Sequence, residues 1–128
     1  MNKKILIVDD DPDMRRALHL RLRAQGYETA FAADGLTATS VALKEAPDLV
    51  LLDLGLPAGD GFVVMDRFRK NSVLSSIPVI VLTAREAQEN AEAAFSAGCF
   101  AFFQKPADNS ALMTTIGRAL EESGVLMT

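Results

Sequence analysis

Three short runs of Ile, Leu and Val recur along the chain, at residues 5–8, 49–52 and 79–82. Each is bounded by charged residues, proline or threonine. Continuous apolarity, rather than alternation with polar residues, is typical of strands covered on both faces, as in parallel sheets. Two weaker segments, residues 27–32 and 99–104, are predicted as flanking strands.

Helical patterns occupy the intervals between these strands. Asp11 is predicted to cap a helix that has Pro12 in its first turn and stops at Gly26. Its apolar face contains Leu18 and excludes His19, which is therefore expected on the surface. Further helices are predicted at residues 36–46, 62–70, 86–97 and 109–122, the last ending near Gly124.

A strand followed by a helix thus repeats five times, which predicts an α/β fold. This alternation implies a parallel sheet with helices on both faces, joined by right-handed crossovers. The chain has 128 residues, 49% of them hydrophobic, which suits one domain with a substantial core. No linker or repeat interrupts it, so residues 1–128 are read as a single domain with its core at 3–122 and a short tail at 123–128.

Composition excludes several classes of function. One Cys and one His rule out a disulfide framework, a cysteine zinc site and a polyhistidine metal site. A net charge of −4 gives no electrostatic support for binding nucleic acid. No apolar stretch is long enough to span a membrane or to act as a signal peptide, so we expect no membrane association and a cytoplasmic location.

Chemistry-bearing residues follow four of the five predicted strands. In an open α/β sheet, the functional crevice lies at the carboxyl ends of the strands. The residues expected to meet there are Asp9, Asp10, Asp11, Asp53, Thr83, Ala84 and Lys105.

Carboxylates gathered in this way repel one another by roughly 1–4 kcal/mol per pair at about 4 Å. Binding a cation relieves the repulsion, and ligands that are all oxygen favour a hard ion such as Mg²⁺. Asp9, Asp10 and Asp53 would be balanced by Mg²⁺ together with Lys105. The sequence therefore predicts a site that is stabilised by Mg²⁺.

A carboxylate beside a divalent ion, a lysine and a hydroxyl is suited to accepting a phosphoryl group. Lys105 would place a positive charge on one phosphoryl oxygen, and Thr83 would donate a hydrogen bond to another. The sequence contains neither of the glycine-rich motifs that bind nucleotide phosphates. The phosphoryl group is therefore expected from a small donor or from another protein.

These motifs resemble the receiver domain of two-component response regulators, the CheY-like family. The similarity covers about residues 3–122 and depends on several pieces in the right order. They are LIVDDD (6–11), PDLVLLDLGLP (47–57), DG (60–61), IPVIVLTA (77–84), AG (97–98) and KP (105–106). The resemblance implies a doubly wound (βα)5 fold whose five-stranded parallel sheet has the order 2-1-3-4-5.

The resemblance also assigns roles. Asp53 is the implied phosphoacceptor. The implied Mg²⁺ ligands are Asp10, Asp53 and the backbone carbonyl of Gly55, with Asp9 acting largely through water. The implied contacts to the phosphoryl group come from Thr83, the backbone N–H of Ala84, and Lys105. The phosphodonor would be a histidine kinase or a histidine phosphotransfer protein, and the domain would catalyse only its own phosphorylation and dephosphorylation.

The output would be a changed surface over residues 86–97, 99–104 and 109–122, read by a downstream protein, a missing effector domain or a dimer partner. Thr83 and Phe102 would form the switch. Phe102 stands where the family often has Tyr, so the ring is kept and its hydroxyl is lost. Gly55 and Arg85 lie two residues beyond Asp53 and Thr83, beside the path of the attacking water in this family, which leaves the phosphoryl lifetime open.

Simpler readings account for some of these residues. Helix capping suffices for Asp11 and Asp13, turn chemistry for Asp60 and Gly61, and packing for Cys99. Three other whole functions compete with the phosphorylatable switch: a phosphatase, a receiver-like module that binds partners without phosphorylation, and a flavodoxin. The phosphatase lacks a second carboxylate at Gly55, and the flavodoxin lacks a phosphate loop after the first strand. The phosphorylation-independent module is the main alternative.

Overall fold

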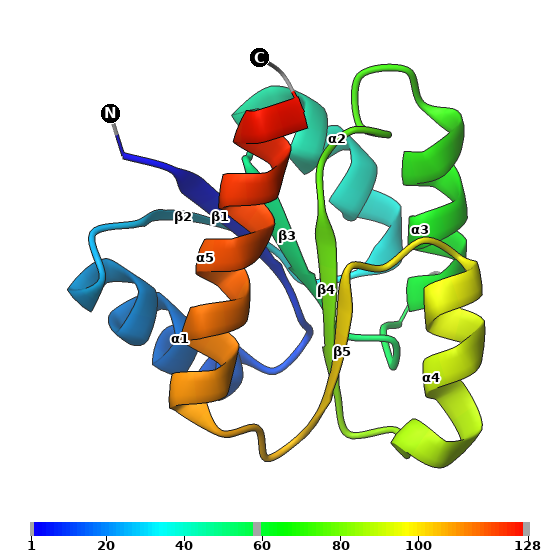
Figure 1. Ribbon diagram of the computed structural model, residues 1–128. Helices are drawn as coiled ribbons and strands as arrows, with labels where there is room; N and C mark the ends of the chain where they lie inside the picture. The colour runs from blue at the N-terminus through cyan, green and yellow to red at the C-terminus, as the bar shows by residue number, and fades with distance from the viewer. Residues whose placement is uncertain (1, 58–59, 127–128) are drawn as a thin grey trace.

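Five strands alternate with five helices in the computed structural model, which describes residues 2–57 and 60–126 (Figure 1). The strands are β1 (Lys4–Val8), β2 (Glu28–Ala32), β3 (Leu49–Leu52), β4 (Val79–Thr83) and β5 (Ala101–Gln104). The helices are α1 (Pro12–Ala24), α2 (Gly35–Glu45), α3 (Gly61–Lys70), α4 (Ala87–Ser96) and α5 (Asn109–Leu126).

The strands form one parallel sheet in the order β2-β1-β3-β4-β5, which confirms the predicted topology. Leu51, in the central strand β3, pairs with Ile7 of β1 and with Ile80 of β4. The chain winds outward from β1 to β2, and then outward in the other direction from β3 to β5. The carboxyl ends of β1 and β3 therefore lie side by side at the point where the winding reverses, which is where α/β sheets form their binding crevice.

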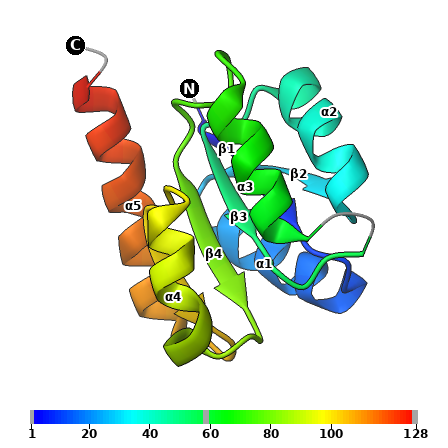
Figure 2. The same cartoon turned by 90° about the vertical axis from the view of Figure 1, so that its right-hand side faces the viewer.

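The sheet separates two apolar cores. Ile5 and Ile7 of β1 pack with α1 and α5 on one face, while Leu6 and Val8 pack with α2, α3 and α4 on the other. Figures 1 and 2 show the same division, with the sheet between the two groups of helices. Because both faces are covered, β3 and β4 are buried at every position, and all of their residues except Thr83 at the end of β4 are apolar, as the sequence pattern predicts.

Aspartates start four of the helices. The carboxylates of Asp11, Asp34, Asp60 and Asp108 accept hydrogen bonds from backbone N–H groups in the first turns of α1, α2, α3 and α5. The N-cap of α4, Glu86, makes no such bond with its side chain. The side chain of Gln104 reaches across from β5, and its Oε1 accepts a hydrogen bond from the N–H of Ala87 at 3.0 Å.

Two local predictions were wrong. The last helix does not end near Gly124 but continues to Leu126, because one glycine lowers helix propensity by only about 1 kcal/mol. His19 is half-buried rather than exposed: its Nδ1 lies 2.6 Å from Oγ1 of Thr29, and its ring packs against Phe31. Position 19 is outside the apolar face of α1 but faces the edge strand β2.

None of the helices in the described part of the chain combines the length and the apolar character that crossing a membrane requires.

Candidate functional site

Three carboxylates meet at the carboxyl ends of β1 and β3. Each of Asp9, Asp10 and Asp53 offers an oxygen atom, and these atoms all lie within 4.8 Å of one another. Asp9 and Asp53 are buried, and Asp10 is exposed. Strand pairing sets this arrangement, since Val8 is in register with Leu52 and the N–H of Asp53 donates to the Val8 carbonyl at 2.9 Å. The residue that directly follows each strand is an aspartate, and the two aspartates therefore lie at the same edge of the sheet.

Lys105 reaches this cluster from the loop after β5. Its Nζ lies 2.8 Å from Oδ2 of Asp9 and 3.6 Å from Oδ2 of Asp53. Partial burial disfavours the charged ammonium, but the hydrogen bond to Asp9 and the negative charges of Asp53 and Asp9 outweigh that effect. The pKa of Lys105 is raised as a result, so the side chain carries its positive charge at neutral pH.

The Asp9 carboxylate is held from both sides. Its Oδ1 accepts the N–H of Asp11 at 2.9 Å, while Oδ2 accepts from Lys105. The Arg15 guanidinium donates to the Asp9 carbonyl at 2.8 Å, which ties α1 to the same loop. With 3% of its surface exposed, Asp9 has little water to solvate its charge, and these donors replace it.

The loop after β3 is packed tightly around Asp53. Oδ1 of Asp53 accepts the N–H of Gly55 at 3.1 Å. Gly61, at the start of α3, donates its N–H to the Leu54 carbonyl at 3.0 Å. A Cβ at Gly61 would lie 2.6 Å from Cα of Leu54 and 2.7 Å from the Asp53 carbonyl oxygen. The first turn of α3 can approach Asp53 this closely only because residue 61 has no side chain.

The remaining predicted site residues lie at the end of β4, in the loop after it, and in β5. Thr83 is fully buried at the end of β4, and its hydroxyl accepts the N–H of Arg85 at 3.3 Å. Ala84 is exposed. Phe102 is partly buried against the core under α2, α3 and α4. Among the described residues, no hydrogen bond links the Thr83 hydroxyl to a carboxylate.

Sequence reasoning missed one polar contact beside the site. The Arg85 guanidinium, from the loop after β4, forms an ion pair with Oδ2 of Asp60 at 2.6 Å. The same carboxylate caps α3 through Oδ1, which accepts the N–H of Phe62 at 2.9 Å. The capping role was predictable from the position of Asp60, but the reach of Arg85 across 25 residues leaves no periodic signal.

The donor set suits a hard cation. Carboxylate oxygens from two neighbouring loops converge, one member is exposed, and the only described amine in contact with them is Lys105. Oxygen ligands with open positions for water are typical of Mg²⁺ sites in proteins. The acidic cluster could therefore bind a metal ion.

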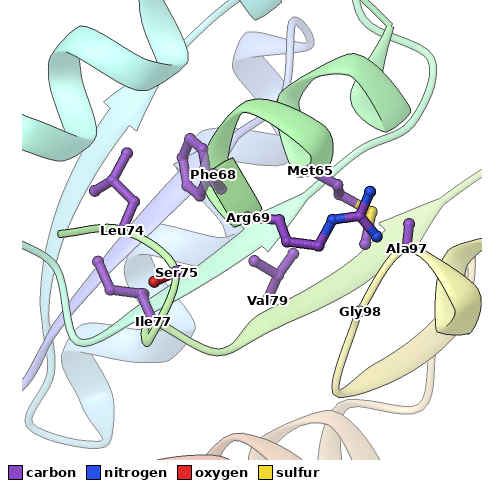
Figure 3. A pocket seen from close by; sticks show the side chains of 9 residues that line it. All are labelled: Met65, Phe68, Arg69, Leu74, Ser75, Ile77, Val79, Ala97 and Gly98. Atoms are coloured by element: carbon purple, nitrogen blue, oxygen red, sulfur yellow. The ribbon is translucent and has the colours of Figure 1, made fainter. Parts of the chain in front are cut away.

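A separate hollow of about 140 Å³ lies beside the amino end of β4, away from the acidic cluster. Figure 3 shows its lining residues, which come from α3, the segment after it, the start of β4, and the turn after α4. Met65, Phe68 and Leu74 give it an apolar floor, and Arg69 is engaged with Asp66 on α3. It offers no cluster of groups suited to catalysis or metal binding.

Comparison with known proteins gives one consistent result. The family model for the response regulator receiver domain matches residues 5–117. The chain is 39% identical over 108 residues to sporulation initiation phosphotransferase F of Bacillus subtilis, covering 84% of this chain and 86% of that protein. It is 40% identical over 119 residues to the transcriptional regulatory protein GlrR of Escherichia coli, covering 93% of this chain but 26% of that one.

The fold is also shared with solved structures. One is the receiver domain of the sensor histidine kinase PA1611 from Pseudomonas aeruginosa, with a magnesium ion coordinated in its active-site cleft. The TM-score is 0.86 at 29% identity, covering 94% of this chain and 99% of that one. Among curated relatives, the chain spans 48% of one regulator and 26% of two others, so it corresponds to one part of those longer proteins.

Proposed function

The chain belongs to the response regulator receiver domain family, and we propose that it is a phosphorylatable switch with Asp53 as phosphoacceptor. Receiver domains are phosphoacceptor signalling domains rather than enzymes that turn over a separate substrate. The observation that carries the proposal is the position of Lys105, whose ammonium lies 2.8 Å from Asp9 and 3.6 Å from Asp53. An acceptor carboxylate, an acidic pair and a cation are thereby brought together from three loops.

Asp9, Asp10 and Asp53 would hold the metal ion, with the Gly55 carbonyl as a further ligand. Their oxygens lie close enough together for one hard cation, and Lys105 balances only one of their three charges. A bound Mg²⁺ would neutralise the negative charge that develops as a phosphoryl group approaches Asp53. The magnesium ion reported in the PA1611 receiver supports the choice of metal.

In the transfer step, one bond to phosphorus forms and one breaks. A carboxylate oxygen of Asp53 attacks the phosphorus of a phosphohistidine, the new O–P bond forms, and the P–N bond breaks with its electron pair returning to the imidazole. Lys105 places its positive charge beside the incoming phosphoryl oxygens. Thr83 would donate its hydroxyl hydrogen to one of these oxygens, and the exposed Ala84 would leave room and offer its backbone N–H.

The phosphoryl group adds about −2 charge and strong acceptors to the site. The Thr83 hydroxyl now accepts the N–H of Arg85 and makes no hydrogen bond to a described carboxylate, so donating to the phosphoryl group would require its side chain to shift toward Asp53. This shift would bias the surface of α4, β5 and α5, with Phe102 following as Thr83 moves. The result is a two-state population shift that a partner can detect.

A histidine kinase or histidine phosphotransfer protein would supply the phosphoryl group. The output would be a downstream protein, an effector domain outside this sequence, or a dimer through α4, β5 and α5. The domain itself would not bind nucleic acid, in keeping with its net charge of −4. A cytoplasmic location remains a prediction from the sequence.

The experiment is incubation with acetyl phosphate and Mg²⁺, followed by intact mass measurement. We expect the wild type to gain the mass of one phosphoryl group, and Asp53→Asn to gain nothing. Asp11→Asn is the matched control, because it removes a carboxylate from the same acidic run while keeping an N-cap residue. No gain in the wild type would reject the proposal and favour a phosphorylation-independent module. A gain that survives Asp53→Asn would reject Asp53 as the phosphoacceptor.

A further inference from the structure

An ion pair spans the two loops that flank the phosphoacceptor. Arg85 extends from the loop after β4, and its Nη2 lies 2.6 Å from Oδ2 of Asp60 at the start of α3. About a third of each side chain is exposed, 36% for Arg85 and 38% for Asp60. Ion pairs with this exposure contribute little to stability, so this one can exchange its partner at low cost.

The anionic end of this pair belongs to the residue before a segment that packs against the Asp53 backbone. Asp60 is followed directly by Gly61, whose missing Cβ would lie 2.7 Å from the Asp53 carbonyl oxygen. The Asp60 carboxylate is also fixed in place, because its Oδ1 caps α3 through the N–H of Phe62. The Arg85 guanidinium is therefore held one residue away from a segment that touches the phosphoacceptor.

The cationic end of the pair is linked to Thr83. The N–H of Arg85 donates to the Thr83 hydroxyl, and the N–H of Lys105 donates to the Thr83 carbonyl at 2.7 Å. Arg85 thus lies in the same short segment as Thr83, which is proposed to turn toward a phosphoryl group. Arg15 also lies at this end of the sheet, but its guanidinium is on the Asp9 carbonyl beside β1.

We propose that Arg85 pairs with Asp60 while Asp53 is unphosphorylated. When Asp53 is phosphorylated, the Arg85 guanidinium leaves Asp60 and binds the phosphoryl group. This inference depends on the proposed function. Phosphorylation replaces one negative charge on Asp53 by about two, which leaves a surplus that Lys105 and a divalent ion do not balance. A guanidinium binds a phosphoryl group through two parallel N–H donors, whereas Asp60 offers it only Oδ2.

Because Asp60 and the phosphoryl group compete for Arg85, removing Asp60 and removing Arg85 should have opposite effects on binding of a phosphoryl group. Asp60→Asn releases Arg85 and still caps α3, because asparagine is as good an N-cap as aspartate. Arg85→Gln removes the cation that would reach the phosphoryl group. Asp66→Asn is the matched control, since it removes a carboxylate that pairs with Arg69 and Lys70 on the same helix.

The experiment is a titration with beryllofluoride, an imitation of a bound phosphoryl group, at saturating Mg²⁺ and followed by fluorine NMR. We expect Asp60→Asn to bind beryllofluoride about two- to fivefold more tightly and Arg85→Gln to bind it weaker by a similar factor, the range for one partly exposed ion pair. The double variant should behave like Arg85→Gln alone, and Asp66→Asn like the wild type. Thermal unfolding of each variant verifies that it is folded.

Three results would overturn the inference. Unchanged or tighter binding by Arg85→Gln would mean that Arg85 does not contact the phosphoryl group. Unchanged binding by Asp60→Asn would mean that Asp60 does not compete for Arg85. If Asp60→Asn tightened binding equally in the presence of Arg85→Gln, the effect would come from the lost negative charge alone. Failure of the wild type to bind beryllofluoride would instead reject the proposed function, and this inference with it.

Discussion

Lys105 and Asp9 are 96 residues apart in the sequence, yet Nζ of Lys105 lies 2.8 Å from Oδ2 of Asp9. Their side chains are 16% and 4% exposed. Asp9 follows β1 and Lys105 follows β5, and two strands separate these in the sheet. The lysine therefore extends over the ends of β4 and β3 to reach its partner, and this contact ties the two sides of the site together.

Replacing Lys105 should destabilise the protein. In Lys105→Met the buried Asp9 carboxylate loses its main cation, so we expect the free energy of unfolding to fall by about 1–3 kcal/mol in the absence of divalent ions. Adding Mg²⁺ should recover part of this loss. The control is Lys4→Met, whose pair with Glu45 is about one-third exposed and should contribute about 0–1 kcal/mol. Chemical denaturation at two Mg²⁺ concentrations measures both effects.

The pH dependence of this contact follows from the raised pKa of Lys105. A raised pKa in the folded state means that the contribution is complete below the ordinary lysine value of 10.5 and is lost as the pH rises through the higher folded value. Lys105→Met should remove this loss from the alkaline limb of the stability profile. If Lys105→Met and Lys4→Met lost equal stability, the contact between Lys105 and Asp9 would be an ordinary surface ion pair.

Mg²⁺ should stabilise the wild type. At ten times its dissociation constant, a ligand that binds only the folded state adds about 1.4 kcal/mol to the free energy of unfolding, or roughly 3–6 °C in Tm. Asp10→Asn should reduce the shift, because it removes the exposed member of the acidic cluster. Thermal scans with and without Mg²⁺ provide the measurement. A Tm that is indifferent to Mg²⁺, or a full shift in the variant, would contradict the metal assignment.

Two glycine-to-alanine substitutions should have opposite effects. Gly61→Ala would place a methyl group 2.6 Å from Cα of Leu54, so we expect a loss of about 2–4 kcal/mol and displacement of the loop that carries Asp53. At Gly117, inside α5, a Cβ meets nothing within 4 Å. Gly117→Ala should therefore stabilise the protein by about 0.5–1 kcal/mol. Denaturation midpoints measure both, and a neutral Gly61→Ala would argue against the close approach of α3 to Asp53.

Cys99 should be chemically inert in the folded protein. Burial raises the pKa of its thiol from 9.0 to about 11, and 7% of the residue is exposed. At pH 8 the reactive thiolate is then about 100-fold scarcer than for a free cysteine. Iodoacetamide labelling should be slow in native buffer and fast in denaturant. Rapid labelling of the native protein would show that the segment before β5 opens readily.

Apolar patterning predicted most of the fold. Uninterrupted runs of Ile, Leu and Val predict the buried strands, and capping residues such as Asp11 predict where helices begin. Knowing where these strands end also predicted that Asp9 and Asp53 would meet, because parallel strands in register place their following residues at one edge.

The contacts that the sequence did not predict depend on how far individual side chains extend between loops. Arg85 meets Asp60, and Gln104 caps α4 at Ala87, through loops whose conformations no periodicity encodes. His19 fits the same pattern: its position on α1 is clear from the helical repeat, but the nearness of β2 depends on how the helix packs. The sequence pattern fixes elements and their order, while contacts between loops require coordinates.

Under the proposed function, Asp53 and no other carboxylate of the cluster carries the phosphoryl group. The most direct test is to phosphorylate the protein with acetyl phosphate and Mg²⁺, reduce it with borohydride, and sequence the peptides by mass spectrometry. Borohydride converts an aspartyl phosphate to homoserine and leaves free carboxylates intact. We predict homoserine at position 53 alone; homoserine at position 9 or 10, or at none of the three, would contradict the account.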